Sequence, residues 1–303
     1  MALDSRDSSR RPVVLAAAMV AVLAASVAVA AWLSQMRGAP RRAGDAVLEH
    51  LRTRGLAAFW GRQTETLWYL LRDARGRAVG WWRLRRSPIE GGYQGHVVRR
   101  SAGSFDEEQW SLGERATEGQ YQADEYALVQ RPGLAVPLRQ HQVTTRISLA
   151  RGQVVVARTP SRRRGIRASD TAPEHYVPEG VTTLVLSLAA AGGKPAVFAL
   201  VFNEFGLSAS GVQFAEATVE PQGPRRARIT YSLVLEDLGK KVGWAEVLEF
   251  DAGGNVLRGT RPDSGITWEQ ASFEDVRGQF PEAARYAEPP DANSPTTREE
   301  TDN

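Results

Sequence analysis

Segments in which apolar and polar residues alternate recur along most of this 303-residue chain, between Thr66 and Gln270. In the clearest of them, residues 227–235, every second side chain is apolar, and those between are mostly polar. A period of two places one row of side chains in a core and the other in water, as in an antiparallel strand. About a dozen such strands exceed what an open twisted sheet holds, so the sheet should curl or split into a sandwich. We therefore expect a mainly β fold, a curved antiparallel sheet or half-barrel with one or two short helices.

Turn residues divide the chain into its predicted strands. Gly, Pro, Ser or Asp bounds most segments, and tight turns are predicted at residues 74–77, 151–152 and 252–255. A basic loop, residues 160–170, interrupts the pattern. The predicted strands are residues 66–73, 78–86, 93–101, 106–114, 119–130, 134–150, 153–159, 196–204, 211–220, 225–236, 242–251, 256–260 and 266–270.

Residues 181–191 are apolar, and their spacing fits both a helix and a strand. We favour a short buried helix, because Thr182 or Thr183 is suited to cap it. Against the concave side of the sheet, such a helix would enclose an apolar groove. Leu184 and Leu188 share one face in either conformation, so they are the predicted ligand contacts of that groove.

A second short helix is predicted near the N-terminus of the β-rich region, after a basic linker at residues 38–44. Asp45 is suited to cap this helix, and Leu48 and Leu51 lie on one side of it. Gly55 marks its expected end.

An uncharged apolar run, residues 13–33, lies close to the start of the chain. As a helix it would be about 30 Å long, the thickness of the hydrocarbon core of a bilayer. The alternative is a cleaved signal peptide, because basic residues precede the run and Ala28-Val29-Ala30 resembles a cleavage site. We predict an uncleaved single-pass anchor, since Trp32 and Leu33 extend the run beyond that site. Arginines flank both ends of the run, so its orientation rests on its likeness to an export signal.

The predicted organisation follows from these segments. Residues 1–12 form a cytoplasmic tail, 13–33 the transmembrane anchor or signal, and 34–65 a linker with a short helix. Residues 66–280 form the β-rich domain, and the acidic, Pro-containing residues 281–303 a disordered tail. We expect an inner-membrane, single-pass protein whose C-terminal domain lies in the periplasm or outside the cell.

Composition excludes several classes of function. The chain has 38 Lys and Arg against 35 Asp and Glu, a formal net charge of +3, so no strong field favours nucleic acid. It contains no cysteine, which excludes disulfides, thiolate metal sites, iron–sulfur ligation and a cysteine nucleophile. No two of its four histidines lie within five residues, so no local metal pair exists and no cofactor is predicted.

Two acidic clusters are the only candidates for catalysis. They are Asp106-Glu107-Glu108 and Asp124-Glu125. Paired carboxylates perform acid–base chemistry when their environments separate their pKa values. Charge at a solvated strand edge, which discourages aggregation, is the simpler interpretation of both. An exported hydrolase with a carboxylate-based site is therefore the alternative prediction of function.

Two further groups are candidates for ligand binding. Arg162, Arg163 and Arg164 form the densest basic patch, with Arg158 and Arg167 nearby, and guanidinium groups match the oxygens of anionic headgroups or phosphate. Trp81 and Trp82 are adjacent in a predicted strand, so their rings should point to opposite faces. One of the two should leave the core unless both faces of the sheet are covered.

The strand Trp68-Tyr69-Leu70-Leu71, with Gly76 and Val79-Gly80-Trp81 after it, resembles a motif of exported bacterial β-domains. These are the DUF3108-like domains and, more distantly, the lipoprotein carriers with an unclosed barrel. The resemblance extends over residues 66–270 and implies a curved antiparallel sheet outside the cytoplasm. It also implies a lipid or envelope role and transfers no catalytic residue. The segment is also similar to one that precedes transglutaminase-like domains, but that activity needs a cysteine. The sequence therefore predicts a membrane-anchored, extracytoplasmic, non-enzymatic β-domain that binds a lipid or an envelope partner protein, and no nucleic acid.

Overall fold

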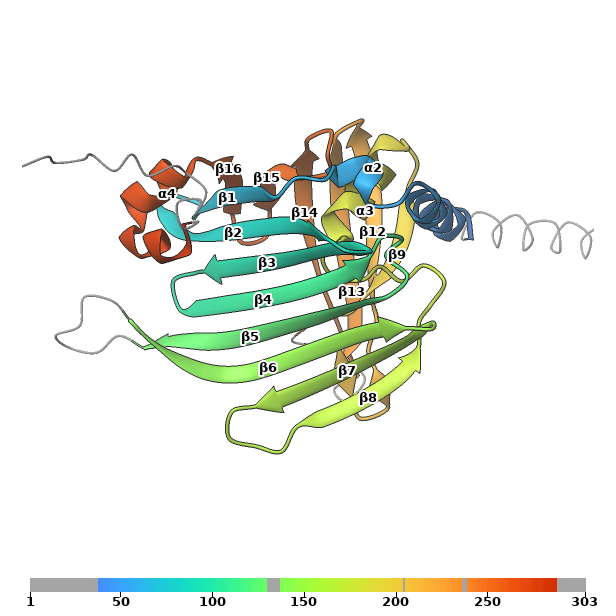
Figure 1. Ribbon diagram of the computed structural model, residues 1–303, viewed down its shortest axis with the longest axis horizontal. Coiled ribbons are helices and arrows are strands. Elements are labelled where there is room, and N and C mark those ends of the chain that lie inside the picture. Colours follow the sequence, from blue (N-terminus) through green and yellow to red (C-terminus); the bar gives the residue numbers. More distant parts are fainter. Residues whose placement is uncertain (1–37, 130–136, 204, 236–238, 288–303) are drawn as a thin grey trace, which may run out of the picture.

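The computed structural model describes residues 38–129, 137–203, 205–235 and 239–287. One antiparallel sheet of 14 strands dominates it, in the order β8-β7-β6-β5-β4-β3-β2-β1-β16-β15-β14-β13-β12-β9 (Figure 1). Its strands are β1 (Glu65–Arg72), β2 (Ala78–Ile89), β3 (Gly92–Arg100), β4 (Ser104–Gly113), β5 (Gly119–Val129), β6 (Leu138–Ala150), β7 (Gln153–Pro160), β8 (Ile166–Thr171), β9 (Ala196–Leu200), β12 (Ala215–Gly223), β13 (Arg226–Leu235), β14 (Lys240–Phe250), β15 (Val256–Arg261) and β16 (Ile266–Ala271). The prediction of a mainly β, antiparallel fold is confirmed.

The sheet bends into two walls that face each other. Strands β1–β8 form one wall, and β9 with β12, β13 and β14 forms the other, crossing behind the first (Figure 1). The two ends of the sheet, β8 and β9, do not pair with each other, so the curved sheet stays open. A small hairpin of β10 (Leu207–Ser208) and β11 (Gly211–Val212) contacts β8, where the Val212 amide donates to Asp170 Oδ2 at 2.7 Å.

The main hydrophobic core lies between the walls. Ile147 and Val156 from the first wall and Phe198 and Ile229 from the second are at most 3% exposed and belong to one cluster. We call the sheet face toward this core the inner face. A smaller cluster, which includes Trp68, Leu70, Val98 and Phe105, covers part of the opposite, outer face of the first wall. Most of the first wall is therefore covered by protein on its inner face alone. This explains why apolar and polar residues alternate along its strands.

The helix predicted at residues 181–191 is confirmed as α3 (Thr182–Ala191), which packs on β12 and β13. The predicted cap is wrong: Val181 occupies the N-cap position, and no side chain caps the helix. Thr182 instead donates its hydroxyl to the Pro178 carbonyl, 3.4 Å away. Apolar burial replaces capping here, since α3 carries five fully buried side chains.

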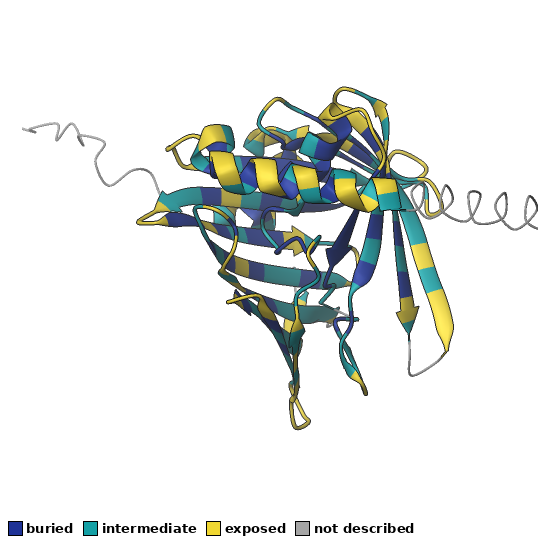
Figure 2. Ribbon diagram, turned by 90° about the vertical axis from the view of Figure 1, so that its right-hand side faces the viewer, coloured by how far each residue is buried: buried dark blue, intermediate teal, exposed yellow. Residues whose placement is uncertain are grey.

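The first described helix is longer than predicted. Residues 38–54 are helical, so the expected linker is helical and Asp45 lies inside the helix instead of capping it. Packing explains the difference, because Gly44 fits so closely against β9 that an added Cβ would lie 2.3 Å from the Val197 carbonyl oxygen. Figure 2 shows this helix bridging the two walls at one end. The predicted end is correct: Gly55 adopts a φ of +74° and donates to the Leu51 carbonyl at 2.8 Å, and α2 (Ala57–Trp60) follows.

Three segments depart from the predicted pattern. The basic loop at residues 160–170 contains most of β8, and the strand predicted at 211–220 divides into β11 and β12. After β16, the chain forms α4 (Phe273–Gln279) and the 3₁₀ helix η2 (Pro281–Tyr286), neither of which was predicted. The predicted disordered tail therefore begins too early, because residues 281–286 pack on the outer face and Ala283 is fully buried.

The predicted membrane segment, residues 13–33, lies outside the described residues. Within the described ranges, every helix is too short or too polar to cross a bilayer.

Candidate functional site

A wide groove of about 830 Å³ lies on the outer face of β2–β8. Its side chains come from alternate positions of neighbouring strands, which the sheet register aligns. One row is Ser87, Gln94, Ser111, Gln120, Ser148 and Val155, and the next is Arg85, His96, Gln109, Gln122, Arg146, Ala157 and Arg167. Seven strands at about 4.8 Å spacing make the second row about 29 Å long. We call this surface the outer groove.

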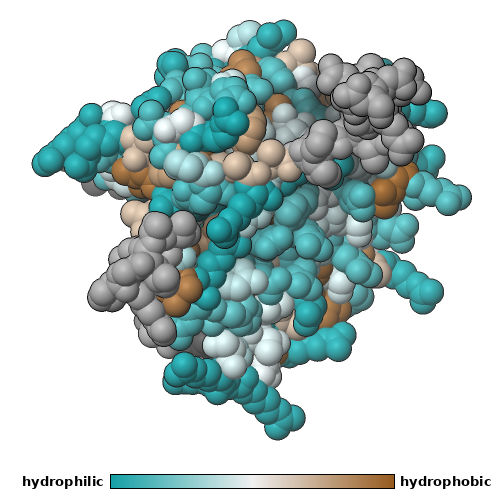
Figure 3. Space-filling view, turned by 60° about the vertical axis from the view of Figure 1, so that its left-hand side comes forward, coloured by the Kyte–Doolittle hydropathy of each residue, from teal (hydrophilic) through white to brown (hydrophobic). Residues whose placement is uncertain are grey.

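The outer groove is polar. Figure 3 shows a mostly hydrophilic surface on this side of the molecule, with apolar atoms in small patches. Gly95, Trp110, Tyr121 and Ile147 also line the groove, but the last three belong to the core on the inner face. They contribute backbone to its floor, because successive side chains of a strand point to opposite faces.

The ionisable side chains that face into the outer groove are all basic. They are Arg85, Arg146, Arg167 and His96, and no carboxylate is among the lining residues. Arg146 Nε donates to Gln122 Oε1 at 2.9 Å, which orients that guanidinium along the row. Guanidinium, amide and hydroxyl groups in register are suited to hold an extended ligand that carries hydroxyl and anionic oxygens.

A row of His and acidic side chains borders the outer groove. His96 Nε2 lies 2.8 Å from Glu107 Oε1, and His141 Nε2 lies 3.6 Å from Asp124 Oδ1. Glu107 and Asp124 are register partners on β4 and β5, so the two pairs meet. The row contains part of both predicted acidic clusters, and all four side chains are partly exposed.

The acidic row does not form a nucleophile relay. In a relay, one nitrogen of the base contacts the nucleophile and the other contacts the acid. Here His141 uses a single nitrogen, Nε2, toward both Asp124 and Thr144, whose Oγ1 is 3.0 Å away. The Thr144 hydroxyl itself donates to Asp124 at 2.5 Å.

Partial burial alone would raise the pKa of Asp124, but hydrogen bonds from Thr144 and Gln122 outweigh it and lower the pKa below its usual value. Asp124 therefore stays ionised and is a weak general base. In the part of the chain that the structure describes, no three His, Asp or Glu side chains converge to hold a metal.

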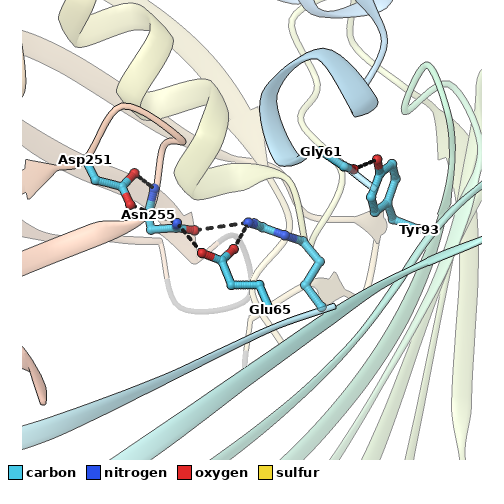
Figure 4. Close-up of polar contacts among 6 residues, drawn as sticks. Gly61, Glu65, Tyr93, Asp251 and Asn255 are labelled. Carbon is cyan, nitrogen blue, oxygen red and sulfur yellow. Dashed lines mark hydrogen bonds and ion pairs between the residues drawn. The ribbon is translucent and has the colours of Figure 1, made fainter. Parts of the chain in front are cut away.

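A second charged network is buried and joins elements across the fold (Figure 4). Arg86 is 4% exposed and donates to Glu65 and, at 3.3 Å, to Asn255 Oδ1. Asn255 Nδ2 donates in turn to Glu65 at 3.1 Å and to Asp251 at 2.9 Å. Burial lowers the pKa of Arg86, and the Glu65 charge opposes that shift. Every group drawn in this network has a protein partner, so its role is to tie β1 and β2 to the β14–β15 turn.

Another acidic group with a shifted pKa lies in the loop before α3. Burial, with the charge of Glu108 as a smaller cause, raises the pKa of Glu179 to about 8. Glu108 is 5% exposed and pairs with Arg99 across β3 and β4. The carboxyl of Glu179 is therefore protonated at neutral pH and donates or accepts hydrogen bonds without a charge.

The structure does not bring the predicted ligand residues together. Trp81 is fully buried on the outer face, and Trp82 is partly buried on the inner face beside Tyr69 and Trp268, with ring centres 4.7 and 5.8 Å away. Both faces of β2 are thus covered, and this is the case in which neither tryptophan was expected to leave the core. Leu184 is 2% exposed in the main core.

The other predicted residues lie elsewhere. Leu188 is partly buried against the main core. Arg162, Arg163 and Arg164 are exposed in the β7–β8 turn. Of the basic patch, Arg167 reaches the outer groove, whereas Arg158 lies on the inner face, 4.0 Å from Glu125.

The sequence-based prediction did not include the amide and hydroxyl rows of the outer groove. A signal for them existed, because two polar residues spaced by one recur in successive strands: Gln94 and His96, Gln109 and Ser111, Gln120 and Gln122, Arg146 and Ser148. Each pair alone is an ordinary solvated strand face. Only their repetition on neighbouring strands indicates a continuous surface.

Comparisons with known proteins give little further information. No protein-family model matches the chain, and no curated protein matches it. Among solved structures, it is similar to a beta-barrel-like protein of domain of unknown function DUF1849 from Brucella abortus, with 12% sequence identity and a TM-score of 0.43. That similarity covers 68% of this chain and 93% of the other. The resemblance to DUF3108-like domains and lipoprotein carriers stays a prediction.

Proposed function

We propose that this chain is a non-enzymatic, membrane-anchored, extracytoplasmic β-domain that binds a linear anionic glycan of the cell envelope in the outer groove. The observation that supports this proposal is the charge of the groove: three arginines and a histidine line it, and no carboxylate does. This ligand differs from the lipid or envelope partner protein that the sequence predicts.

The chemistry of the lining favours a sugar chain over an acyl chain. The side chains that face outward in the groove are amides, hydroxyls, guanidiniums and one imidazole, except for Val155 and Ala157. Amide and hydroxyl groups pair with sugar hydroxyls, and guanidinium forks pair with carboxylate or phosphate groups along the chain. The open, elongated shape suits a polymer that passes across several strands.

Replacing Arg146 or Arg167 with glutamine should weaken binding of a polygalacturonate oligomer about fivefold each. Glutamine keeps hydrogen-bonding capacity and removes the charge, and an exposed ionic contact contributes about 1 kcal/mol. Binding should also weaken as ionic strength rises, because salt screens exposed charges. Calorimetric titration of the full chain in phosphatidylcholine nanodiscs measures both effects.

Arg228→Gln is the matched control, because Arg228 is exposed on β13 and does not line the groove. A neutral maltooligosaccharide of the same length should bind far more weakly than the acidic oligomer. Equal binding of the two sugars would contradict the proposal. Binding to phosphatidylglycerol vesicles without binding to the acidic sugar would favour lipid headgroups instead, and cleavage of the oligomer during titration would favour the hydrolase alternative.

The location of the domain is a separate prediction. Alkaline phosphatase fused to the C-terminus of the full chain should be active in a bacterial host, and a green fluorescent protein fusion at the same position should be dark. The apolar run at residues 13–33 and the basic residues before it support this orientation. The opposite pattern of activities would place the domain in the cytoplasm and remove envelope glycans as ligands.

A further inference from the structure

The C-terminal segment covers one end of the outer face and encloses a second cavity. We call α4 and η2 together the C-terminal strap, residues 273–286. The cavity, here the strap pocket, has a volume of about 490 Å³, within the range of about 300–1,000 Å³ for small-molecule sites. Its apolar lining is Trp81, Phe105, Leu128, Pro137, Leu138 and Tyr286, and its charged lining is Arg100, Arg139, Arg285 and Glu282.

The strap pocket is lined by more guanidinium groups than carboxylates, three arginines against one glutamate. Arg100 pairs with Glu282 at 2.7 Å, so that pair is compensated. Arg139 lies 3.3 Å from the centre of the Phe105 ring and donates to the Tyr286 hydroxyl. Within the described residues, no carboxylate forms an ion pair with Arg139. The aromatic contacts hold this guanidinium in place, which prepares it to bind an anion.

The interior of the strap pocket is mostly apolar. Phe105 is 2% exposed, and Leu128, the register partner of Arg139 on β5, packs in the same cluster. Leu138 contributes backbone to the lining, because it precedes Arg139 on β6 and its side chain points to the opposite face. Deeper in the pocket, Trp81 is fully buried, and its indole nitrogen has no hydrogen-bond partner.

We propose that the strap pocket binds a single-chain amphiphilic carboxylate, such as a fatty-acid anion. Its carboxylate pairs with Arg139, and its hydrocarbon chain contacts Phe105 and Leu128. The apolar lining of the cavity supplies the contact area, and the Arg139 guanidinium supplies the charge. This site is separate from the outer groove and does not depend on the glycan proposed there.

Photo-crosslinking tests the site in the full chain. A dodecanoate with a diazirine at the end of its chain is added to the protein in phosphatidylcholine nanodiscs, and labelled peptides are mapped by mass spectrometry. We expect labels on the ends of β5 and β6 and on the C-terminal strap, with dodecanoate competing about tenfold better than dodecanol. A tenfold difference is what one charge-assisted hydrogen bond provides.

Two variants act on different parts of the proposed contact. Arg139→Gln should reduce labelling about tenfold and remove the preference for dodecanoate over dodecanol. Leu128→Asp should reduce labelling by a similar factor, because Leu128 is the register partner of Arg139 and the new carboxylate would compete for its guanidinium. Leu128 is only partly buried, so this variant should fold. Arg277→Gln, on the strap outside the pocket, and Leu257→Asp, 42% exposed on β15, should change neither labelling nor melting temperature.

Three results would overturn the proposal. They are the absence of competable labelling in the wild type, labels confined to other elements, and equal competition by dodecanol and dodecanoate. Unchanged labelling in both Arg139→Gln and Leu128→Asp would also contradict it. Loss of acidic-glycan binding in the groove variants has no bearing on these results, because the two ligands use different residues.

Discussion

Replacing Leu184 with aspartate is expected to unfold the domain. Leu184 is 2% exposed, and its side chain packs so closely on the β14–β15 turn that a Cβ added at Gly254 would lie 2.7 Å from it. The variant loses the buried leucine and places a carboxylate among the apolar side chains of the main core. The combined cost is about 4 kcal/mol or more, a large share of the stability of a typical domain.

Urea denaturation followed by circular dichroism measures this effect. Leu184→Ala should cost about 3 kcal/mol, and Leu188→Ala less, because Leu188 is only partly buried. Thr183→Asp is the matched control: Thr183 is exposed in the first turn of α3, where the helix dipole favours a carboxylate. It should leave the midpoint nearly unchanged.

This result also decides between two interpretations of α3. The sequence predicts that this helix encloses an apolar groove in which Leu184 and Leu188 contact a ligand. Such a helix would be a lid that an acyl chain displaces. A folded Leu184→Asp variant with a wild-type midpoint and lost fatty-acid binding would support the lid. Unfolding of the variant would instead show that α3 is part of the core, as its burial indicates, and would leave the strap pocket as the site for acyl chains.

The strand content was predictable because one face of most strands is dry. In β13, Ala227, Ile229, Tyr231 and Leu233 are at most 6% exposed, whereas Arg226 and Arg228 face water. This alternation of apolar and polar residues is visible in the sequence whichever strands become neighbours. The hairpin of β1 and β2 was equally local, since the Asp73 amide donates to the Arg77 carbonyl at 3.0 Å across the predicted turn.

The helices were less predictable because packing across the fold stabilises them. The helix at residues 38–54 contains Gly38, Pro40 and Gly44, which favour a linker, but close contact with β9 outweighs their low propensity. For α4, a local signal was overlooked: Ser272 and Asp275 form a capping box, in which the Asp275 amide donates to Ser272 Oγ at 3.1 Å.

The candidate sites depend on register, which the sequence does not reveal. Arg85, Arg146 and Arg167 are far apart in the chain and lie in one row only because β2 to β8 pair in order. A shift of one residue in any pairing would send one of these side chains to the inner face. The strap pocket similarly needs Tyr286 to return to β2 and β4, a contact that local patterns do not indicate.

Replacing Arg86 with leucine is the second change expected to have a large effect. It leaves Glu65 beside Asp251 without its cation, and it removes the contact in which the Arg86 guanidinium lies 4.1 Å from the centre of the Trp60 ring. Breaking a buried ion pair costs about 3–5 kcal/mol. The Glu65 side chain is 36% exposed and keeps part of its hydration, so we expect a loss of about 2 kcal/mol.

A double variant separates the charge from the packing. Adding Glu65→Leu to Arg86→Leu should restore about half of the lost stability, because the apolar pair leaves no uncompensated charge. Urea denaturation of wild type, both single variants and the double variant completes the cycle, with Arg228→Leu as an exposed control. If the double variant were less stable than either single variant, the Glu65 charge would not be the cause of the loss. The network would then stabilise the β14–β15 turn through Asn255 alone, whose backbone amide donates to Asp251 Oδ1 at 2.8 Å independently of Arg86.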